Sequence, residues 1–175
     1  ERAISLDDKD SWAFALRGRV ASLQRRHAEA LRAFEHAVEL NPNKAEVLAE
    51  RGAALIWAGR PDEGVRSYET AEKYDPNMKP IHLATLGIGY YLANRYHDAV
   101  RVLDRSAQLS PANPFAYVGL AAAYAQLGNT ERAAQAADEV RRRHPFFEPA
   151  EFGSLLTDAR QNAHLTEGLA QAGFR

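Results

Sequence analysis

Residues 45–78 read AEVLAERGAALIWAGRPDEGVRSYETAEKYDPNM, and this stretch decides the fold because copies of its pattern lie on both sides of it. Two small residues and one proline of the pattern recur along the chain. The three series are Gly18, Gly52, Gly87 and Ala121; Ala30, Gly64, Ala99 and Ala133; and Pro42, Pro76, Pro111 and Pro145. Each series has intervals of 34, 35 and 34 residues. An irregular spacing shared by three independent series indicates a repeat array rather than a single ordinary domain.

Each repeat has two halves, and both halves carry apolar residues at helical spacing. In residues 45–78 the first half has Leu48 and Leu55, and the second half has Val65 and Tyr68. A turn rich in Gly, Pro or Asn separates the halves, and a proline ends the second helix because it has no N–H to donate. The pattern therefore predicts a helical hairpin. The small residues are expected where its two helices approach closely, since a bulky side chain there would overpack the contact.

Complete repeats are predicted at residues 11–44, 45–78, 79–113 and 114–147, with Lys79 as the one extra residue. Residues 1–10 align with residues 35–44, so they are interpreted as the tail of a second helix in a truncated repeat. On this interpretation the chain is a fragment of a longer protein.

The period ends after Pro145, and residues 148–175 are predicted to form capping helices, which the last repeat of a solenoid requires. The first has an apolar face that can cover the last hairpin. Its apolar residues are Phe146, Phe147, Phe152, Leu155 and Leu156. The second is expected over about residues 163–172, with Asp158 or Asn162 as N-cap and Gly173 as its end.

The repeated residues resemble the tetratricopeptide repeat over about residues 1–147. The third repeat carries the family's pattern most fully, with Leu83, Leu86, Gly87, Tyr90, Ala99, Leu103, Ser106 and Pro111. The departures are Arg17, Arg51, Gly64 and Ala137. The resemblance implies an all-α fold, a right-handed superhelical solenoid of antiparallel helix pairs with C-terminal capping helices. The closing HLTEGLAQAGF is also similar to the tail that follows such repeats in bacterial class III adenylate cyclases and related regulators.

Composition and motifs exclude several functions. The chain has 22 basic and 23 acidic residues and no cysteine. This balance gives no field that would steer it onto nucleic acid or an anionic membrane, so neither is expected as a partner. It shows no signal peptide and no apolar run long enough to span a bilayer, so a cytoplasmic location is expected. Six scattered histidines form no metal-binding motif, and no catalytic or phosphate-binding motif is present. The chain is therefore predicted to be no enzyme, with no cofactor or metal.

The remaining candidate site is a groove, which the family resemblance places along the first helices of the repeats. The residues predicted to bind a partner are Arg19, Glu46, Glu50, Trp57, Ile88, Tyr91, Phe115 and Gln126. Large apolar side chains beside small ones favour gripping an apolar helix or extended peptide. The alternative is that these side chains pack against neighbouring helices, and for Trp12 and Leu16 the sequence leaves the two readings open.

Three function classes follow. A non-catalytic protein-binding scaffold for a protein or peptide partner is favoured. The first alternative is a C-terminal regulatory arm of a bacterial signalling protein, such as an adenylate cyclase or a transcriptional regulator, and the second is a self-association module that forms homo-oligomers. Residues 141–143 are all arginine. They suit a helix C-terminus or a solvated face, with an acidic partner as the alternative.

Overall fold

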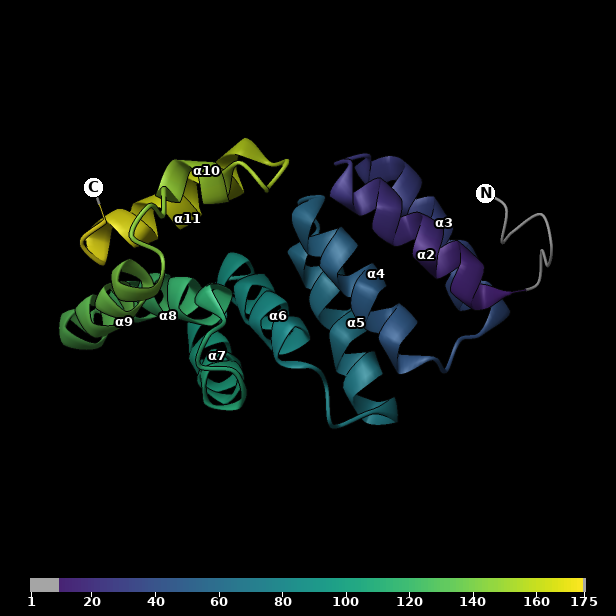
Figure 1. The fold of residues 1–175 in the computed structure, drawn as a ribbon, viewed down its shortest axis with the longest axis horizontal. Helices are drawn as coiled ribbons and strands as arrows, with labels where there is room; N and C mark the ends of the chain where they lie inside the picture. The colour runs from purple at the N-terminus through teal and green to yellow at the C-terminus, as the bar shows by residue number, and fades with distance from the viewer. Residues whose placement is uncertain (1–9, 175) are drawn as a thin grey trace. The chain divides into compact units, whose positions relative to one another are not determined.

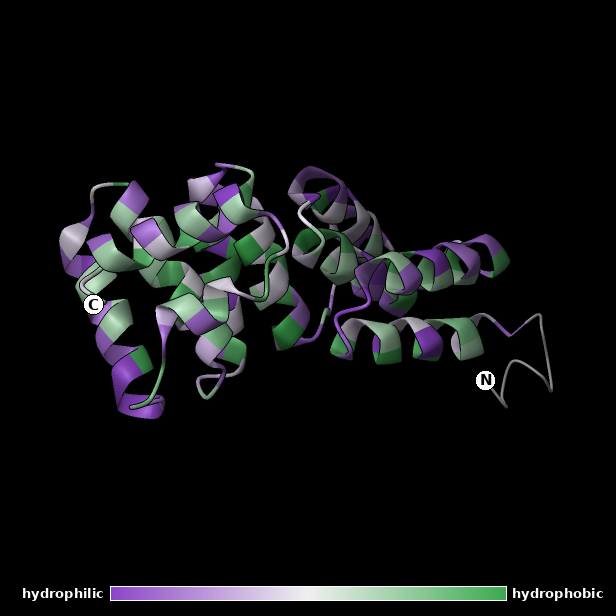
Figure 2. Ribbon diagram, turned by 90° about the horizontal axis from the view of Figure 1, so that it is seen from above, coloured by the Kyte–Doolittle hydropathy of each residue, from purple (hydrophilic) through white to green (hydrophobic). Residues whose placement is uncertain are grey.

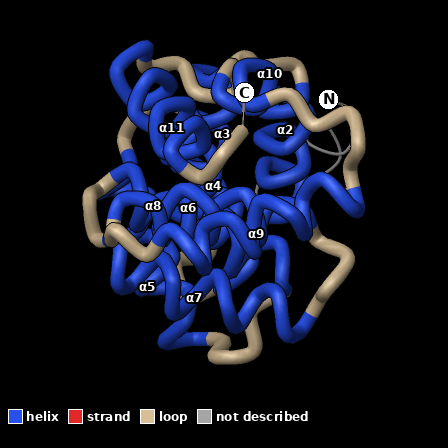
Figure 3. Tube along the Cα trace, turned by 90° about the vertical axis from the view of Figure 1, so that its left-hand side faces the viewer, coloured by secondary structure: helices blue, strands red, loops and turns tan. Residues whose placement is uncertain are grey.

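The computed structural model of the chain describes residues 10–174, which form ten helices joined by short loops and no strand (Figures 1 and 3). The predicted all-α fold is thereby confirmed. The helices are α2 (Ser11–Leu23), α3 (His27–Leu40), α4 (Ala45–Trp57), α5 (Pro61–Tyr74), α6 (Pro80–Leu92), α7 (Tyr96–Leu109), α8 (Pro114–Gln126), α9 (Thr130–Arg143), α10 (Pro149–Gly153) and α11 (Ala159–Gln171). The interpretation of residues 1–10 as the end of a helix falls almost entirely outside the described residues.

The chain divides into two compact units, residues 1–78 and residues 79–175. The connection between them, residues 75–79, is one residue longer than the matching connections at residues 41–44 and 110–113. In both shorter connections the last backbone N–H donates to the carbonyl of the first residue, whereas in the longer one the backbone N–H of Asn77 donates to the Asp75 side chain. The unit boundary thus falls beside Lys79, the one residue that interrupts the repeat spacing.

Within each helix pair the first helix ends in the same way. Arg25, Gly59, Asn94 and Gly128 all adopt a left-handed backbone conformation, with φ between 58° and 82°. After each of them, a backbone N–H reaches back five residues to a helix carbonyl, for example Arg60 to Leu55 at 2.9 Å. This Schellman arrangement satisfies carbonyls that the helix end leaves unpaired and turns the chain into the second helix.

The starts of the helices are also set by local residues. Proline occupies the first position of α5, α6, α8 and α10, where its missing N–H costs nothing. Asp158 caps α11 by accepting hydrogen bonds from the backbone N–H groups of Arg160 and Gln161, each at 2.9 Å. Asp158, and not Asn162, is therefore the N-cap, so α11 starts before the predicted residue 163.

In unit 1, residues 10–78 of the described chain, glycines set the distance between paired helices. A Cβ atom at Gly52 would lie 2.7 Å from the Tyr68 ring, and one at Gly64 would lie 2.6 Å from Ile56 and 2.7 Å from the Gly52 carbonyl oxygen. The backbones of α4 and α5 therefore meet at this glycine pair. This contact explains why Gly64 departs from the family's usual alanine, since a backbone carbonyl cannot move aside as a side chain can.

In unit 2, residues 79–174 of the described chain, α6 and α8 are apolar around most of their surface, whereas α7 and α9 are amphipathic; Figure 2 colours these residues by hydropathy. A helix that is apolar all round needs cover on every side. Leu103 of α7 fills the space that Gly87 and Gly119 leave on α6 and α8. The other side of α6 and α8 is covered by α11, which packs along α8 and reaches α6 (Figure 1).

Candidate functional site

The residues predicted to bind a partner lie in different surroundings in the two units. In unit 1, Arg19 of α2 and Glu50 of α4 form an ion pair with 3.5 Å between Nε and Oε1. Glu46 lies in the first turn of α4 and Trp57 is its last residue, and both are half-buried. The structure thus brings Arg19 and Glu50 together, and a partner-binding role for these four residues stays a prediction.

The two positions that the sequence left open in unit 1 now differ. Trp12 packs against the unit's core cluster, with the Lys44 ammonium 4.6 Å above its ring. Leu16 has 47% of its surface exposed. Trp12 therefore packs half-buried on the core, whereas Leu16 faces solvent.

In unit 2 the chain's own helix α11 lies against Tyr91, one of the residues predicted to bind a partner. Ile88 and Tyr91 of α6 are fully buried, and Gly168 of α11 lies directly against the Tyr91 hydroxyl and near Ala122 of α8. Leu165 and Leu169 of α11 are also fully buried. We call this contact the α11 interface. In this structure neither Ile88 nor Tyr91 is exposed to a partner, so both act as packing residues.

Tyr91 is the polar centre of the α11 interface. Its hydroxyl donates a 2.9 Å hydrogen bond to the His164 carbonyl and bonds to the Gln126 side chain, and its ring stacks on the His164 ring with centroids 4.7 Å apart. Burial raises the pKa of Tyr91 far above its ordinary value. Tyr91 therefore remains a protonated donor at neutral pH, and the predicted site residue Gln126 serves the same internal contact.

Acidification is expected to weaken the α11 interface through His164. Burial lowers the pKa of His164 below its ordinary value of 6.5, with Glu167 acting in the opposite direction. Between the lowered pKa and 6.5 the unfolded chain binds more protons than the folded one, so stability should fall as the pH drops below about 6.5. Urea unfolding at pH 7.5 and 5.5 should show a larger loss for the wild type than for His164→Asn.

The matched control for that measurement is His97→Asn, which changes an exposed histidine of α7 in the same unit. This variant should keep the pH dependence of the wild type. If His164→Asn and the wild type lost equal stability on acidification, His164 would not be the group responsible.

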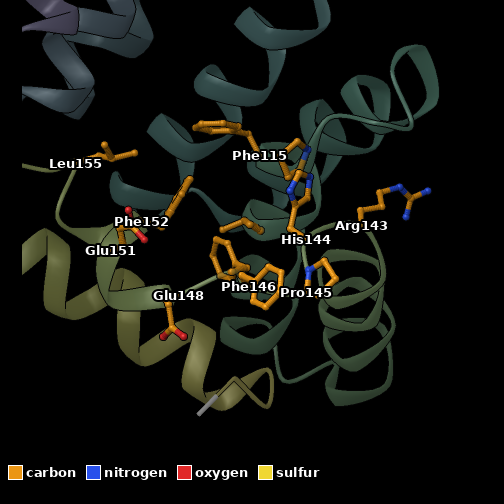
Figure 4. A pocket seen from close by; sticks show the side chains of 12 residues that line it. Phe115, Arg143, His144, Pro145, Phe146, Glu148, Glu151, Phe152 and Leu155 are labelled. Atoms are coloured by element: carbon orange, nitrogen blue, oxygen red, sulfur yellow. The ribbon is translucent and has the colours of Figure 1, made fainter.

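Beside the α11 interface, unit 2 has an open pocket of about 540 Å³, which we call the phenylalanine pocket (Figure 4). Its size is in the range of ligand pockets. It is lined by Pro114, Phe115, Val118, Arg143, His144, Pro145, Phe146, Phe147, Glu148, Glu151, Phe152 and Leu155. These residues come from the first half of α8, the last residue of α9 and the turn after it, and the segment around α10.

Four phenylalanines dominate the walls. Phe152 makes an edge contact with Phe115 at a ring-centroid distance of 5.2 Å and a tilted contact with Phe147 at 5.8 Å. Phe147 in turn makes an edge contact with Phe174 at 5.3 Å. Phe146 stands apart, with 93% of its surface exposed. Phe115 was predicted to bind a partner, but Phe146 and Phe147 were expected to lie in a capping helix. They lie instead in the turn before α10, because Pro149 starts that helix.

The three arginines at residues 141–143 are already paired. Arg141 bonds to Asp138 at 2.7 Å, and Arg142 and Arg143 both contact Glu139. Arg143 also lies over the Tyr117 ring at 4.7 Å, and Figure 4 shows its side chain pointing away from the pocket. These contacts favour a structural role for the arginine run over an acidic partner.

Within residues 10–174, no three His, Asp or Glu side chains gather in a way that could hold a metal ion. None of the helices in that range combines the length and apolarity needed to cross a membrane.

Comparison with known proteins shows which family the chain resembles. The tetratricopeptide repeat family profile matches residues 21–85 and 90–158. The small glutamine-rich tetratricopeptide repeat-containing protein 2 of Mycosarcoma maydis is 29% identical over 113 residues, which are 65% of this chain and 32% of that relative. The chain thus spans about a third of the relative's length.

Two solved structures are similar over most of this chain. The type IV pilus biogenesis factor PilW has a TM-score of 0.73 at 22% identity, covering 99% of this chain and 82% of PilW. YrrB, described as a TPR protein with an unusual peptide-binding site, has a TM-score of 0.69 at 18% identity, covering 98% of this chain and 89% of YrrB. At these identities the likeness shows the shared fold. Because the family profile matches well over half of the sequence, the chain belongs to the tetratricopeptide repeat family.

Proposed function

We propose that the protein is a non-catalytic interaction module that binds a protein or peptide partner through the phenylalanine pocket. The observation that carries this proposal is the exposed Phe146 beside a hollow lined by Phe115, Phe147 and Phe152. Exposed aromatic side chains around a concavity are typical of binding sites, because aromatic anchors supply much of the energy of an interface. That YrrB, a structure of similar fold, is described as having a peptide-binding site supports the same conclusion.

The location of the pocket refines the predicted groove. The α11 interface includes Tyr91 and Gln126, two of the residues that the sequence assigned to a partner, while the start of α8 lines the phenylalanine pocket. Phe115 lies there. A partner segment would therefore bind beside α11 and place one or two large apolar side chains among the phenylalanines.

The test is a selection of random dodecapeptides, displayed on phage, against the full 175-residue chain. Selected peptides should bind Phe146→Ala about thirtyfold more weakly than the wild type, since truncating an anchor residue costs about 2 kcal/mol. Because Phe146 is 93% exposed, its truncation should leave the fold intact. Leu109→Ala, which removes an exposed side chain of α7 outside the pocket, is the matched control. Binding that is equal in all three proteins would refute the proposal.

The regulatory-arm and self-association alternatives stay predictions, as does the cytoplasmic location. The resemblance of the last residues to adenylate cyclase tails likewise stays a prediction.

A further inference from the structure

The charged groups around the phenylalanine pocket differ in whether they are paired within the chain, and this difference bears on the partner's chemistry. Glu148 and Glu151 both line the pocket and are exposed. Within residues 10–174 neither carboxylate forms an ion pair. Arg143, the one arginine of the lining, is held by Glu139 and the Tyr117 ring. Among residues 10–174, the charge left available at the rim is therefore negative.

A structural role accounts for only part of this arrangement. Glu148 is the N-cap residue and Glu151 lies in the first turn of α10, where acidic side chains are favoured by the helix dipole. However, α10 has only 5 residues, so its dipole is small, and the Glu148 side chain makes no capping hydrogen bond. Figure 4 shows the Glu151 carboxylate beside Phe152 at the pocket. Helix capping therefore leaves the position of these two charges at an aromatic pocket unexplained.

Two physical effects act in the same direction on an incoming cation. The carboxylates attract it directly, and the faces of phenylalanine rings carry negative partial charge that favours a lysine or arginine head group. An acidic partner side chain would meet repulsion from both. The apolar walls favour a large hydrophobic side chain, because such a side chain removes their surface from water and a charged group alone would not.

We propose that the phenylalanine pocket recognises a basic apolar peptide segment, in which a large hydrophobic side chain enters the pocket and a neighbouring lysine or arginine pairs with Glu148 and Glu151. This inference rests on the proposed function, since it specifies the partner of the same pocket. The hydrophobic residue supplies the main binding energy, and the basic residue supplies selectivity against neutral and acidic segments.

The dodecapeptide selection tests this inference when it is repeated with the double variant Glu148→Gln, Glu151→Gln. Peptides selected on the wild type should combine a large apolar residue with lysine or arginine more often than the unselected library does. Synthetic copies of them should bind the double variant about two- to thirtyfold more weakly, which is the range for two exposed ion pairs. The difference should shrink as salt is raised from 0.05 to about 0.5 M.

The matched control is Glu131→Gln, Glu167→Gln, which removes the same charge from exposed positions of unit 2 outside the pocket. Its affinity for the peptides should equal that of the wild type. Apolar peptides that depend on Phe146 but show no basic enrichment and no loss in the double variant would overturn the inference and leave the proposed function standing. Equal weakening in the control pair would overturn it too, because net charge would then explain the effect. A selection without any Phe146-dependent peptide would refute both.

Discussion

Replacing Tyr91 with alanine is expected to lower the free energy of unfolding of unit 2 by about 3–5 kcal/mol, the cost of deleting a buried aromatic ring. The ring is fully buried, stacks on His164 and packs against Gly168. Its removal would leave a cavity between α6 and α11 and would remove the hydrogen bond from the Tyr91 hydroxyl to the His164 carbonyl. Urea denaturation measures the loss of unfolding free energy, and hydrogen exchange of unit 2 amides shows whether it is confined to that unit.

Tyr91→Phe separates the contribution of the ring to stability from that of the hydroxyl. It keeps the ring and removes the hydroxyl, so the expected cost is about 1–3 kcal/mol for the polar groups left unpaired. Phe146→Ala is the control with an exposed ring, and it should change the free energy of unfolding little. If Tyr91→Ala left stability unchanged but abolished the binding of selected peptides, Tyr91 would be a partner-binding residue, as the sequence suggested, and the α11 interface would carry little energy.

The sequence predicted the elements of the fold well because each is set by local chemistry. The turn residues at Gly59 and Gly128 mark left-handed helix ends, and Gly52 marks a close helix contact. These requirements act over a few residues or within one hairpin, so a repeated residue type reveals them. Even the unit boundary has a local signal, which is the extra residue Lys79 in the connection between α5 and α6.

The candidate site was predicted less well because it depends on contacts between distant segments. The apolar stripe of α11 shows that this helix must pack somewhere but not which face it covers. In the structure α11 packs on α8 and α6, and its Leu165 and Leu169 are fully buried. Gly168 was the available signal, since a glycine within a helix costs about 1 kcal/mol and is retained where another element comes close.

The phenylalanine pocket escaped prediction for a related reason. Phe146 and Phe147 follow the last periodic proline, so neither helical spacing nor the family pattern applies to them. The residues after Pro145 include Phe146, Phe147, Phe152 and Phe174, a group typical of a capping segment whose rings pack on one another. Phe147 does contact Phe174 in this way. That Phe146 remains exposed is a result of the turn at residues 144–147, which only the folded chain shows.

Replacing Gly168 with leucine is expected to release α11 from unit 2 while α6 to α9 stay folded. A Cβ atom at this position would clash with the Tyr91 hydroxyl and would lie 3.4 Å from the Ala122 Cβ, so a leucine has no space between α6 and α8. Overpacking costs about 1–3 kcal/mol, which corresponds to about a five- to 150-fold loss of hydrogen-exchange protection in α11. Mass spectrometry of exchanged peptides covering α11 and α8 measures it.

Ala170→Leu provides the control for Gly168→Leu, because it adds the same side chain to an exposed position of the same helix. Protection of α11 should be preserved in that variant. Release of α11 also predicts a second change, since His164 owes its lowered pKa mainly to burial. In Gly168→Leu the extra loss of stability below pH 6.5 should therefore disappear together with the protection. A variant that lost protection but kept the acid sensitivity would show that His164 is shielded by something other than the α11 interface.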